Sequence, residues 1–168
     1  MGAPSAIDSL LVAARRDLVR VQPADLADEQ VSGALVVDIR PCEQRQRDGD
    51  LPGAIVVDRN VLEWRLDPSC PHHLPEMKAA DRRIILVCNE GYSSSLAAAT
   101  LRQLGLLHAT DLVGGFQAYQ AWLDLPARDH SRTSQARQST PASSGSRQLQ
   151  VAGDSTVLTG NPDRTHSG

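Results

Sequence analysis

Three short runs of apolar, β-prone residues constrain the fold of this chain more than any other feature. They occupy residues 34–37, 54–57 and 84–87, and a fourth candidate covers residues 110–113. The first three runs are apolar on both faces, a pattern typical of strands that are buried on both sides of a parallel sheet. We therefore expect the core to be a mostly parallel sheet.

Helical spacing of apolar residues marks the segments around these strands. Residues 7–18 show this spacing, with Ser5 and Asp8 placed as a capping box in front of it. A second helix is expected over residues 96–104 and a third over residues 116–123. Strands that alternate with helices are typical of α/β domains, so the sequence predicts a parallel central sheet flanked by helices.

Composition divides the chain after Pro126. Of the 42 residues that follow, 24 are Ser, Thr, Gly, Pro, Gln or Asn, and none is aromatic. Such a segment buries too little apolar surface to offset the entropy of ordering it, so we expect a disordered tail at residues 127–168. The chain of 168 residues suits one domain. We place this domain at residues 23–126, after an N-terminal helical extension at residues 1–22.

Charge and hydropathy exclude several classes of protein. A formal net charge of −3 and an aromatic content of 3% provide neither a basic patch nor a stacking surface for nucleic acid. The longest apolar runs are about five residues, against the roughly 20 that span a bilayer, so no membrane partner is expected. The three cysteines do not form a disulfide framework, which predicts a cytoplasmic protein. Cys70, His72 and His73 lack the further ligands that zinc requires, so we expect no metal site.

Polar residues follow the predicted strands at Asp38, Asp58 and Cys88, on the sheet edge where α/β domains carry their sites. After Cys88 comes a short loop in which Tyr92 is the one bulky side chain, and then a predicted helix. Backbone N–H groups in such a loop, together with the helix dipole, stabilise a thiolate and a bound anion. A cysteine that merely fills space at a strand end is the alternative, and the polar loop favours chemistry.

Four motifs, in this order, resemble those of a single rhodanese domain, the sulfurtransferase fold. They are Val37-Asp38-Ile39-Arg40, Gly49-Asp50-Leu51-Pro52-Gly53-Ala54, Cys88-Asn89-Glu90-Gly91-Tyr92-Ser93-Ser94, and Gly114-Gly115-Phe116 followed by Trp122. The resemblance extends over residues 23–126. It implies a three-layer rhodanese-like domain whose mostly parallel central sheet is flanked by helices.

By this resemblance, Cys88 attacks the outer sulfur of a donor and carries it as a persulfide. The loop residues that would bind the substrate are Asn89, Glu90, Gly91, Tyr92, Ser93 and Ser94. The donor would be thiosulfate or a protein persulfide, and the acceptor a thiol or cyanide. This chemistry requires a thiolate and a ring of N–H donors, with no metal and no cofactor.

Further residues near the strand ends are assigned supporting roles. We expect Asp38 and Arg40 to organise the end of the first strand through hydrogen bonds. Arg59 follows the second strand and is a candidate for the mouth of the substrate pocket, with a solvated surface arginine as the alternative. Cys42 is either a resolving thiol for Cys88 or an ordinary loop thiol.

The loop departs from the family pattern at positions that bear on its substrate. Ser93 stands where many rhodaneses have arginine, Glu90 adds a negative charge, and Asp50 replaces a histidine. A dianion such as thiosulfate should therefore enter less readily, and a weakly active or inactive binding module is the alternative function. Phosphoryl transfer is disfavoured, because related phosphatases have an arginine six residues after the cysteine, where this chain has Ser94.

Overall fold

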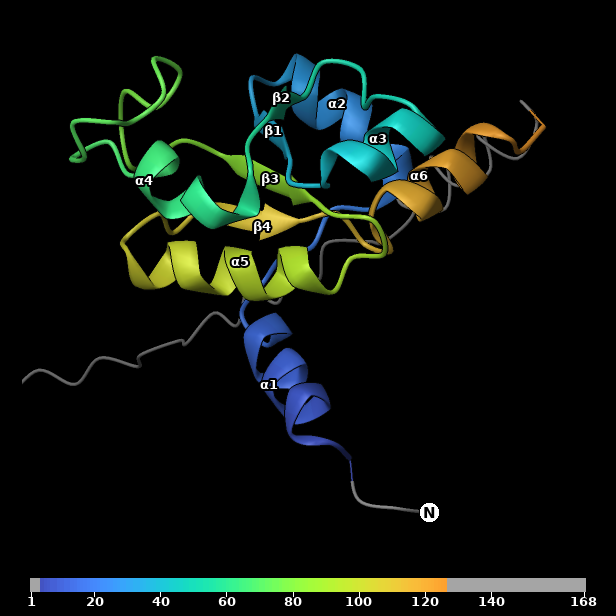
Figure 1. Ribbon diagram of the computed structural model, residues 1–168, viewed down its shortest axis with the longest axis horizontal. Helices are drawn as coiled ribbons and strands as arrows, with labels where there is room; N and C mark the ends of the chain where they lie inside the picture. Colours follow the sequence, from blue (N-terminus) through green and yellow to red (C-terminus); the bar gives the residue numbers. More distant parts are fainter. Residues whose placement is uncertain (1–3, 127–168) are drawn as a thin grey trace, which may run out of the picture.

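The computed structural model describes residues 4–126 of the chain (Figure 1). The predicted tail at residues 127–168 lies outside the described residues. Within these described residues, six α-helices, two short 3₁₀ turns and four strands follow one another. In order they are α1 (Ala6–Arg15), η1 (Pro23–Asp25), α2 (Leu26–Val31), β1 (Leu35–Asp38), α3 (Cys42–Asp48), β2 (Ile55–Val56), η2 (Arg59–Val61), α4 (Leu62–Leu66), β3 (Ile84–Val87), α5 (Ser93–Gln103), β4 (Ala109–Asp111) and α6 (Gly115–Leu123).

The four strands form one parallel sheet in the order β2-β1-β3-β4. The predicted α/β class and parallel sheet are therefore confirmed. Register aligns Asp38 at the end of β1 with Val87 of β3, and Leu86 of β3 with Asp111 at the end of β4. Because carboxyl ends of parallel strands share one edge of a sheet, Asp38, Cys88 and Asp111 all come to that edge.

Helices cover both faces of the sheet and make the domain three-layered (Figure 1). Alternate strand residues enter opposite cores, as the two-residue period of a strand requires. Val37 and Leu86 pack in a cluster with apolar residues of α4 and α5. Val36 and Ile85 pack in a second cluster with residues of α2 and α6. The three-layer architecture is thus the one that the motifs implied.

Two of the predicted strands differ from expectation. Residues 54–57 were expected to be buried on both faces, but β2 is a two-residue edge strand in which Val56 is 52% exposed. An edge strand has a neighbouring strand on one side only, so its apolar side chains can remain partly exposed to solvent. β4 ends at Asp111 instead of continuing to Val113, whose N–H donates to Val21 at 2.8 Å.

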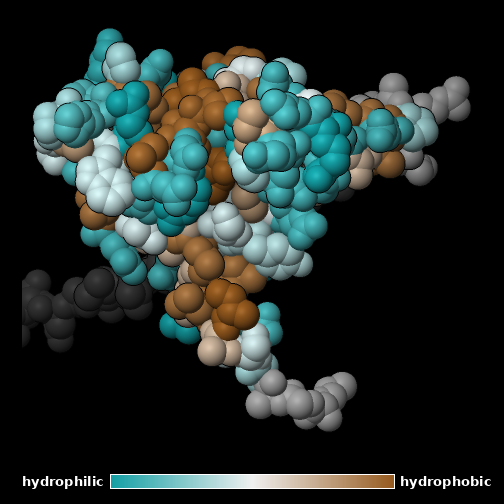
Figure 2. Space-filling model, viewed as in Figure 1, coloured by the Kyte–Doolittle hydropathy of each residue, from teal (hydrophilic) through white to brown (hydrophobic). Residues whose placement is uncertain are grey.

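The N-terminal segment has two parts: α1 projects from the domain, and the residues after it pack into the domain's core. Its predicted capping box is present at the start of α1, and α1 projects beyond α5 with apolar side chains on its surface (Figures 1 and 2). The helix ends at Arg15, and the chain then runs beside β4. There Val21 forms a parallel bridge with Leu112, and Thr110 Oγ1 donates to the Val19 carbonyl at 2.9 Å. Leu18 and Val21 are buried in the two cores.

Within residues 4–126, none of the helices has the length and apolar character needed to span a bilayer.

Candidate active site

Cys88 directly follows β3 and is 7% exposed. A loop of four residues separates it from the first residue of α5, Ser93. Gly91 has a φ of +78°, a backbone conformation that favours glycine, and this turns the loop back over the cysteine. The predicted strand, loop and helix N-terminus are therefore all present.

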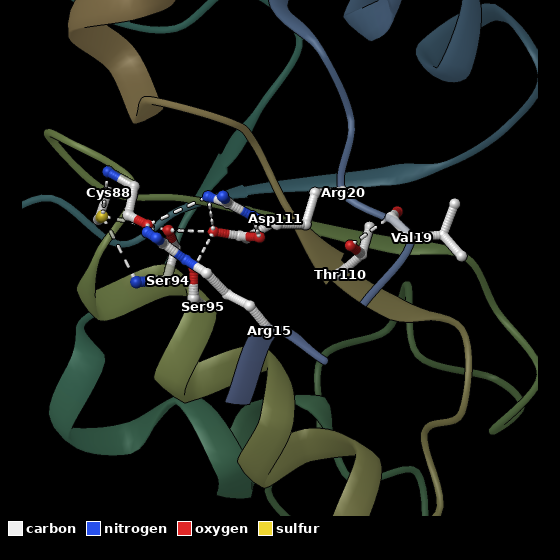
Figure 3. Close-up of polar contacts among 9 residues, drawn as sticks. Arg15, Val19, Arg20, Cys88, Ser94, Ser95, Thr110 and Asp111 are labelled. Atoms are coloured by element: carbon white, nitrogen blue, oxygen red, sulfur yellow. Dashed lines mark hydrogen bonds and ion pairs between the residues drawn. The ribbon is translucent and has the colours of Figure 1, made fainter. Parts of the chain in front are cut away.

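Two backbone N–H donors and one hydroxyl group surround the Cys88 sulfur (Figure 3). The Gly91 N–H lies 3.1 Å from Sγ and the Ser94 N–H lies 3.4 Å from it. The Ser94 hydroxyl oxygen lies 3.1 Å from the same sulfur. Donors fixed in this way stabilise negative charge on sulfur, because they require no reorganisation when the charge forms.

A pocket of about 320 Å³ opens beside Cys88. It is lined by Ile39, Arg40, Pro41, Gln44, Cys88, Asn89, Glu90, Tyr92 and Ser93. Of the six loop residues that the sequence assigned to substrate binding, Asn89, Glu90, Tyr92 and Ser93 line this pocket, while Gly91 and Ser94 contact the sulfur from the loop side. Arg59 does not line this pocket, because its guanidinium pairs with Glu63 one helical turn later at 2.8 Å.

Asp38 and Arg40 form a buried ion pair at one wall of the pocket. Each residue is 1% exposed, and Arg40 Nη2 lies 2.7 Å from Asp38 Oδ2. Arg40 Nη2 also donates to the Gly49 carbonyl, and the guanidinium stacks on the Phe116 ring with its carbon 3.5 Å from the ring centroid. The charge of Arg40 is therefore already compensated. These contacts have the organising character that the sequence suggested for this pair.

The two-glycine turn before α6 packs directly on the Cys88 loop. The Phe116 N–H donates to the Cys88 carbonyl at 2.9 Å, and the Gln117 N–H donates to the Asn89 carbonyl at 3.0 Å. A Cβ at Gly115 would overlap the Cys88 carbonyl and would lie 2.6 Å from the Gly91 nitrogen. Only glycine permits the backbones to come this close, so the Gly114-Gly115 turn fixes the position of the Cys88 loop.

Gln117 connects the loop to α3 on the other side. Its side-chain amide donates to Asn89 Oδ1 at 3.0 Å and to Asp48 Oδ2 at 2.9 Å. Hydrogen bonds from Arg47, with a smaller contribution from Gln117, hold the pKa of Asp48 below its usual value. Asp48 is therefore an ionised acceptor for Gln117 at neutral pH.

Sequence reasoning missed a buried polar network behind the loop. Asp111, at the end of β4, is fully buried and accepts hydrogen bonds from Arg20, Ser94 and Ser95. Arg15 donates to the Gly91 carbonyl at 2.8 Å and to Ser95 Oγ at 3.0 Å. An acidic residue in the fourth strand run was a signal for this network, because it falls on the same sheet edge as Cys88. The two arginines had no comparable signal.

The other two cysteines lie apart from this arrangement. Cys42 is exposed at the start of α3, Cys70 is half-buried, and all three cysteines are free thiols. Neither Cys42 nor Cys70 lines the pocket beside Cys88. In the part of the chain that the structure describes, no three His, Cys, Asp or Glu side chains are grouped to hold a metal ion.

A cysteine held by loop N–H groups at the carboxyl end of a parallel strand is the type of site that rhodanese domains carry. The sequence matches the Rhodanese-like domain family over residues 22–121. The chain therefore belongs to the rhodanese-like domain family.

A curated sulfurtransferase is similar to part of this chain. The adenylyltransferase and sulfurtransferase UBA4 of Candida albicans (strain SC5314 / ATCC MYA-2876) is 32% identical over 111 residues, which cover 64% of this chain and 25% of UBA4. The chain thus spans about a quarter of the length of the curated relatives it matches.

Solved structures share the fold. The protein of unknown function RPA3614, a possible tyrosine phosphatase from Rhodopseudomonas palustris CGA009, is 30% identical with a TM-score of 0.63, covering 73% of this chain and 94% of that chain. The rhodanese-like domain of the Alr3790 protein from Anabaena sp. has a TM-score of 0.50 at 21% identity, covering 89% of this chain and 98% of that one. At this identity the second similarity shows the fold alone.

We predict that Gly115→Ala destabilises the domain more than Gly105→Ala does. Both glycines have positive φ, +62° and +93°, but a Cβ at Gly105 meets nothing within 4 Å. Backbone strain alone should cost about 1 kcal/mol at Gly105, whereas the added collision at Gly115 should raise the loss to roughly 3 kcal/mol. Urea denaturation of both variants measures the difference. Equal losses would mean that the close contact of the turn with the Cys88 loop does not matter.

Proposed function

We propose that this protein is a sulfurtransferase that carries sulfane sulfur as a persulfide on Cys88. The observation that carries this proposal is that two backbone N–H groups donate to Cys88 Sγ, and the Ser94 hydroxyl contacts it, beside an open pocket. The family membership and the sulfurtransferase UBA4 among its relatives agree with it. The proposed partners are a small sulfur donor, such as thiosulfate or a protein persulfide, and a thiol or cyanide acceptor.

The proposed reaction has two displacement steps at sulfur. In the first, the Cys88 thiolate attacks the outer sulfur of the donor; the donor's sulfur–sulfur bond breaks, and its electron pair leaves with sulfite or a thiolate. Cys88 then holds a persulfide anion. In the second, the acceptor thiolate or cyanide attacks the terminal sulfur and releases the Cys88 thiolate. Each intermediate is an anion at the loop, which fixed N–H donors stabilise.

The alternative of phosphoryl transfer, suggested by the description of RPA3614, lacks an electrophilic clamp in this chain. Enzymes that transfer phosphoryl groups stabilise the equatorial oxygens with a cation that is free to bind them. Among the described residues that line the pocket, Arg40 is the one cationic residue, and its guanidinium is buried against Asp38 and Phe116. The site therefore favours a sulfur substrate over a phosphate ester.

We predict that the intact protein gains about 32 Da, the mass of one sulfur, after incubation with a sulfur donor. Thiosulfate and an organic persulfide, whose sulfur–sulfur bonds break in the first step, are tested by mass spectrometry. 3-Mercaptopyruvate is tested next; its carbon–sulfur bond would break instead, with the electron pair leaving on the pyruvate enolate. Cys88→Ser should abolish the gain, while Cys42→Ser, at a cysteine away from the pocket, should retain it. No gain with any donor would favour the binding module. A gain that survives in Cys88→Ser would move the reaction to another cysteine.

We also predict slow turnover with thiosulfate, because the exposed negative charge of Glu90 at the pocket repels this dianion. Removing one charge interaction near a protein surface is worth about 1 kcal/mol, so Glu90→Gln should lower the KM for thiosulfate about fivefold. Ser93→Arg should act in the same direction. Glu76→Gln is the matched control, since Glu76 is exposed and does not line the pocket. An unchanged KM in both pocket variants would contradict this electrostatic explanation.

A further inference from the structure

Two arginines in front of the family match reach the back of the Cys88 loop. Arg15 is the last residue of α1 and Arg20 lies in the segment beside β4, whereas the family match begins at residue 22. Arg15 Nη2 and Arg20 Nη2 donate to the Gly91 carbonyl at 2.8 and 3.2 Å. Because the C=O and N–H of a trans peptide point in opposite directions, a carbonyl held in this way leaves the Tyr92 N–H directed away from the arginines.

Arg20 also neutralises a buried carboxylate. Its Nε lies 2.7 Å from Asp111 Oδ1 and its Nη2 lies 3.0 Å from Oδ2 (Figure 3). Asp111 is fully buried, and the Arg20 side chain is 17% exposed. A buried carboxylate without such a partner is costly, so the Arg20 guanidinium offsets the cost of burying Asp111 behind the loop.

Ser94 links this carboxylate to the sulfur. Its hydroxyl oxygen lies 3.1 Å from Cys88 Sγ and 3.1 Å from Asp111 Oδ2. A hydroxyl has one proton, so it can donate either to the carboxylate or to the sulfur. When it donates to Asp111, its oxygen accepts the Cys88 S–H; when Cys88 is a thiolate, the hydroxyl turns to the sulfur. Asp111 therefore competes with the thiolate for the Ser94 proton, and Arg20 weakens that competition.

The charged and ionisable groups around the loop come from five parts of the chain. They are Glu90 and Tyr92 in the loop, Asp38 at the end of β1 with Arg40 just after it, Asp48 at the end of α3, Asp111 at the end of β4, and Arg15 and Arg20 in the N-terminal segment. Arg40 is paired with Asp38, and Asp48 with Arg47. Arg20 is paired with Asp111, so among these described groups Arg15 is the one cation outside an ion pair, and it lies behind the loop instead of at the pocket.

We propose that Arg15 and Arg20 are positioning residues that stabilise the Cys88 thiolate through the Gly91 carbonyl, Asp111 and the Ser94 hydroxyl. This inference deepens the proposed function, because it takes Cys88 as the nucleophile. Ser93 stands in the loop where many rhodaneses have an arginine. In this chain, arginines of the N-terminal segment would supply positive charge near the loop instead.

The test is the pH dependence of Cys88 alkylation by iodoacetamide, followed by peptide mass spectrometry on the full chain. Arg15→Met, which leaves the Arg20–Asp111 pair in place, should move the midpoint of the profile upward by about one pH unit, so that alkylation on the acidic limb slows about tenfold. Arg20→Lys should give a smaller upward shift, because a lysine keeps a cation beside Asp111 but cannot also bind the Gly91 carbonyl as the guanidinium does. Asp111→Asn should move the midpoint downward, because an amide N–H can donate to Ser94 and leave the Ser94 proton for the sulfur.

An upward midpoint in the arginine variants and a downward midpoint in Asp111→Asn would separate this role from a purely structural one. A purely structural role would change the stability of the fold and leave the alkylation midpoint in place. Arg16→Met is the matched control: Arg16 is an exposed neighbour of Arg15, and its loss changes the net charge equally without moving the midpoint. Should Arg15→Met fail to fold by circular dichroism, Arg20→Lys provides the upward shift. Midpoints equal to that of the parent protein in the folded arginine variants, or an upward shift in Asp111→Asn, would overturn the proposal.

Alkylation does not require sulfur transfer, so the two proposals fail separately. Shifted midpoints without persulfide loading would refute the proposed function alone. Persulfide loading with unshifted midpoints would refute the positioning role alone.

Discussion

The hydrogen bonds and the ion pair of the buried Asp111 carboxylate hold the elements around the Cys88 loop together. Asp111 lies at the end of β4, where it accepts hydrogen bonds from Arg20 and from Ser94 and Ser95 at the start of α5. One side chain thus joins the N-terminal segment, the last strand and the helix that follows the Cys88 loop. A charge without solvent must be fully paired, so these elements have little freedom to separate.

The loop itself is held from three directions. The N-terminal arginines bind the Gly91 carbonyl from behind, the two-glycine turn before α6 packs on the Cys88 and Asn89 carbonyls, and Gln117 ties Asn89 to α3. What remains free is the face toward the pocket. Fixed donors behind an open pocket are what an anionic sulfur intermediate requires, because the protein then stabilises the charge without rearranging. A domain of ordinary size achieves this with backbone groups and a few buried polar side chains.

The sequence predicted the features that depend on local pattern and order. Apolar runs located all four strands, and the Ser5–Asp8 box located the start of α1, because burial and capping leave marks on neighbouring residues. The Cys88 loop was found because its motif is continuous. Burial of β2 was wrong, since an apolar run does not reveal whether a strand is central or at an edge. The Arg20–Asp111 pair could not be predicted, because its partners are separated by 91 residues and meet only in the folded chain.

A crystal structure of the protein loaded with a persulfide donor would show directly whether the Cys88 loop holds an anionic sulfur. We expect a second sulfur bonded to Cys88 Sγ, directed into the pocket lined by Asn89, Glu90 and Ser93 and within hydrogen-bond distance of loop N–H groups. Additional density on Cys42 or Cys70 with Cys88 unmodified, or a second sulfur directed away from the loop N–H groups, would contradict it.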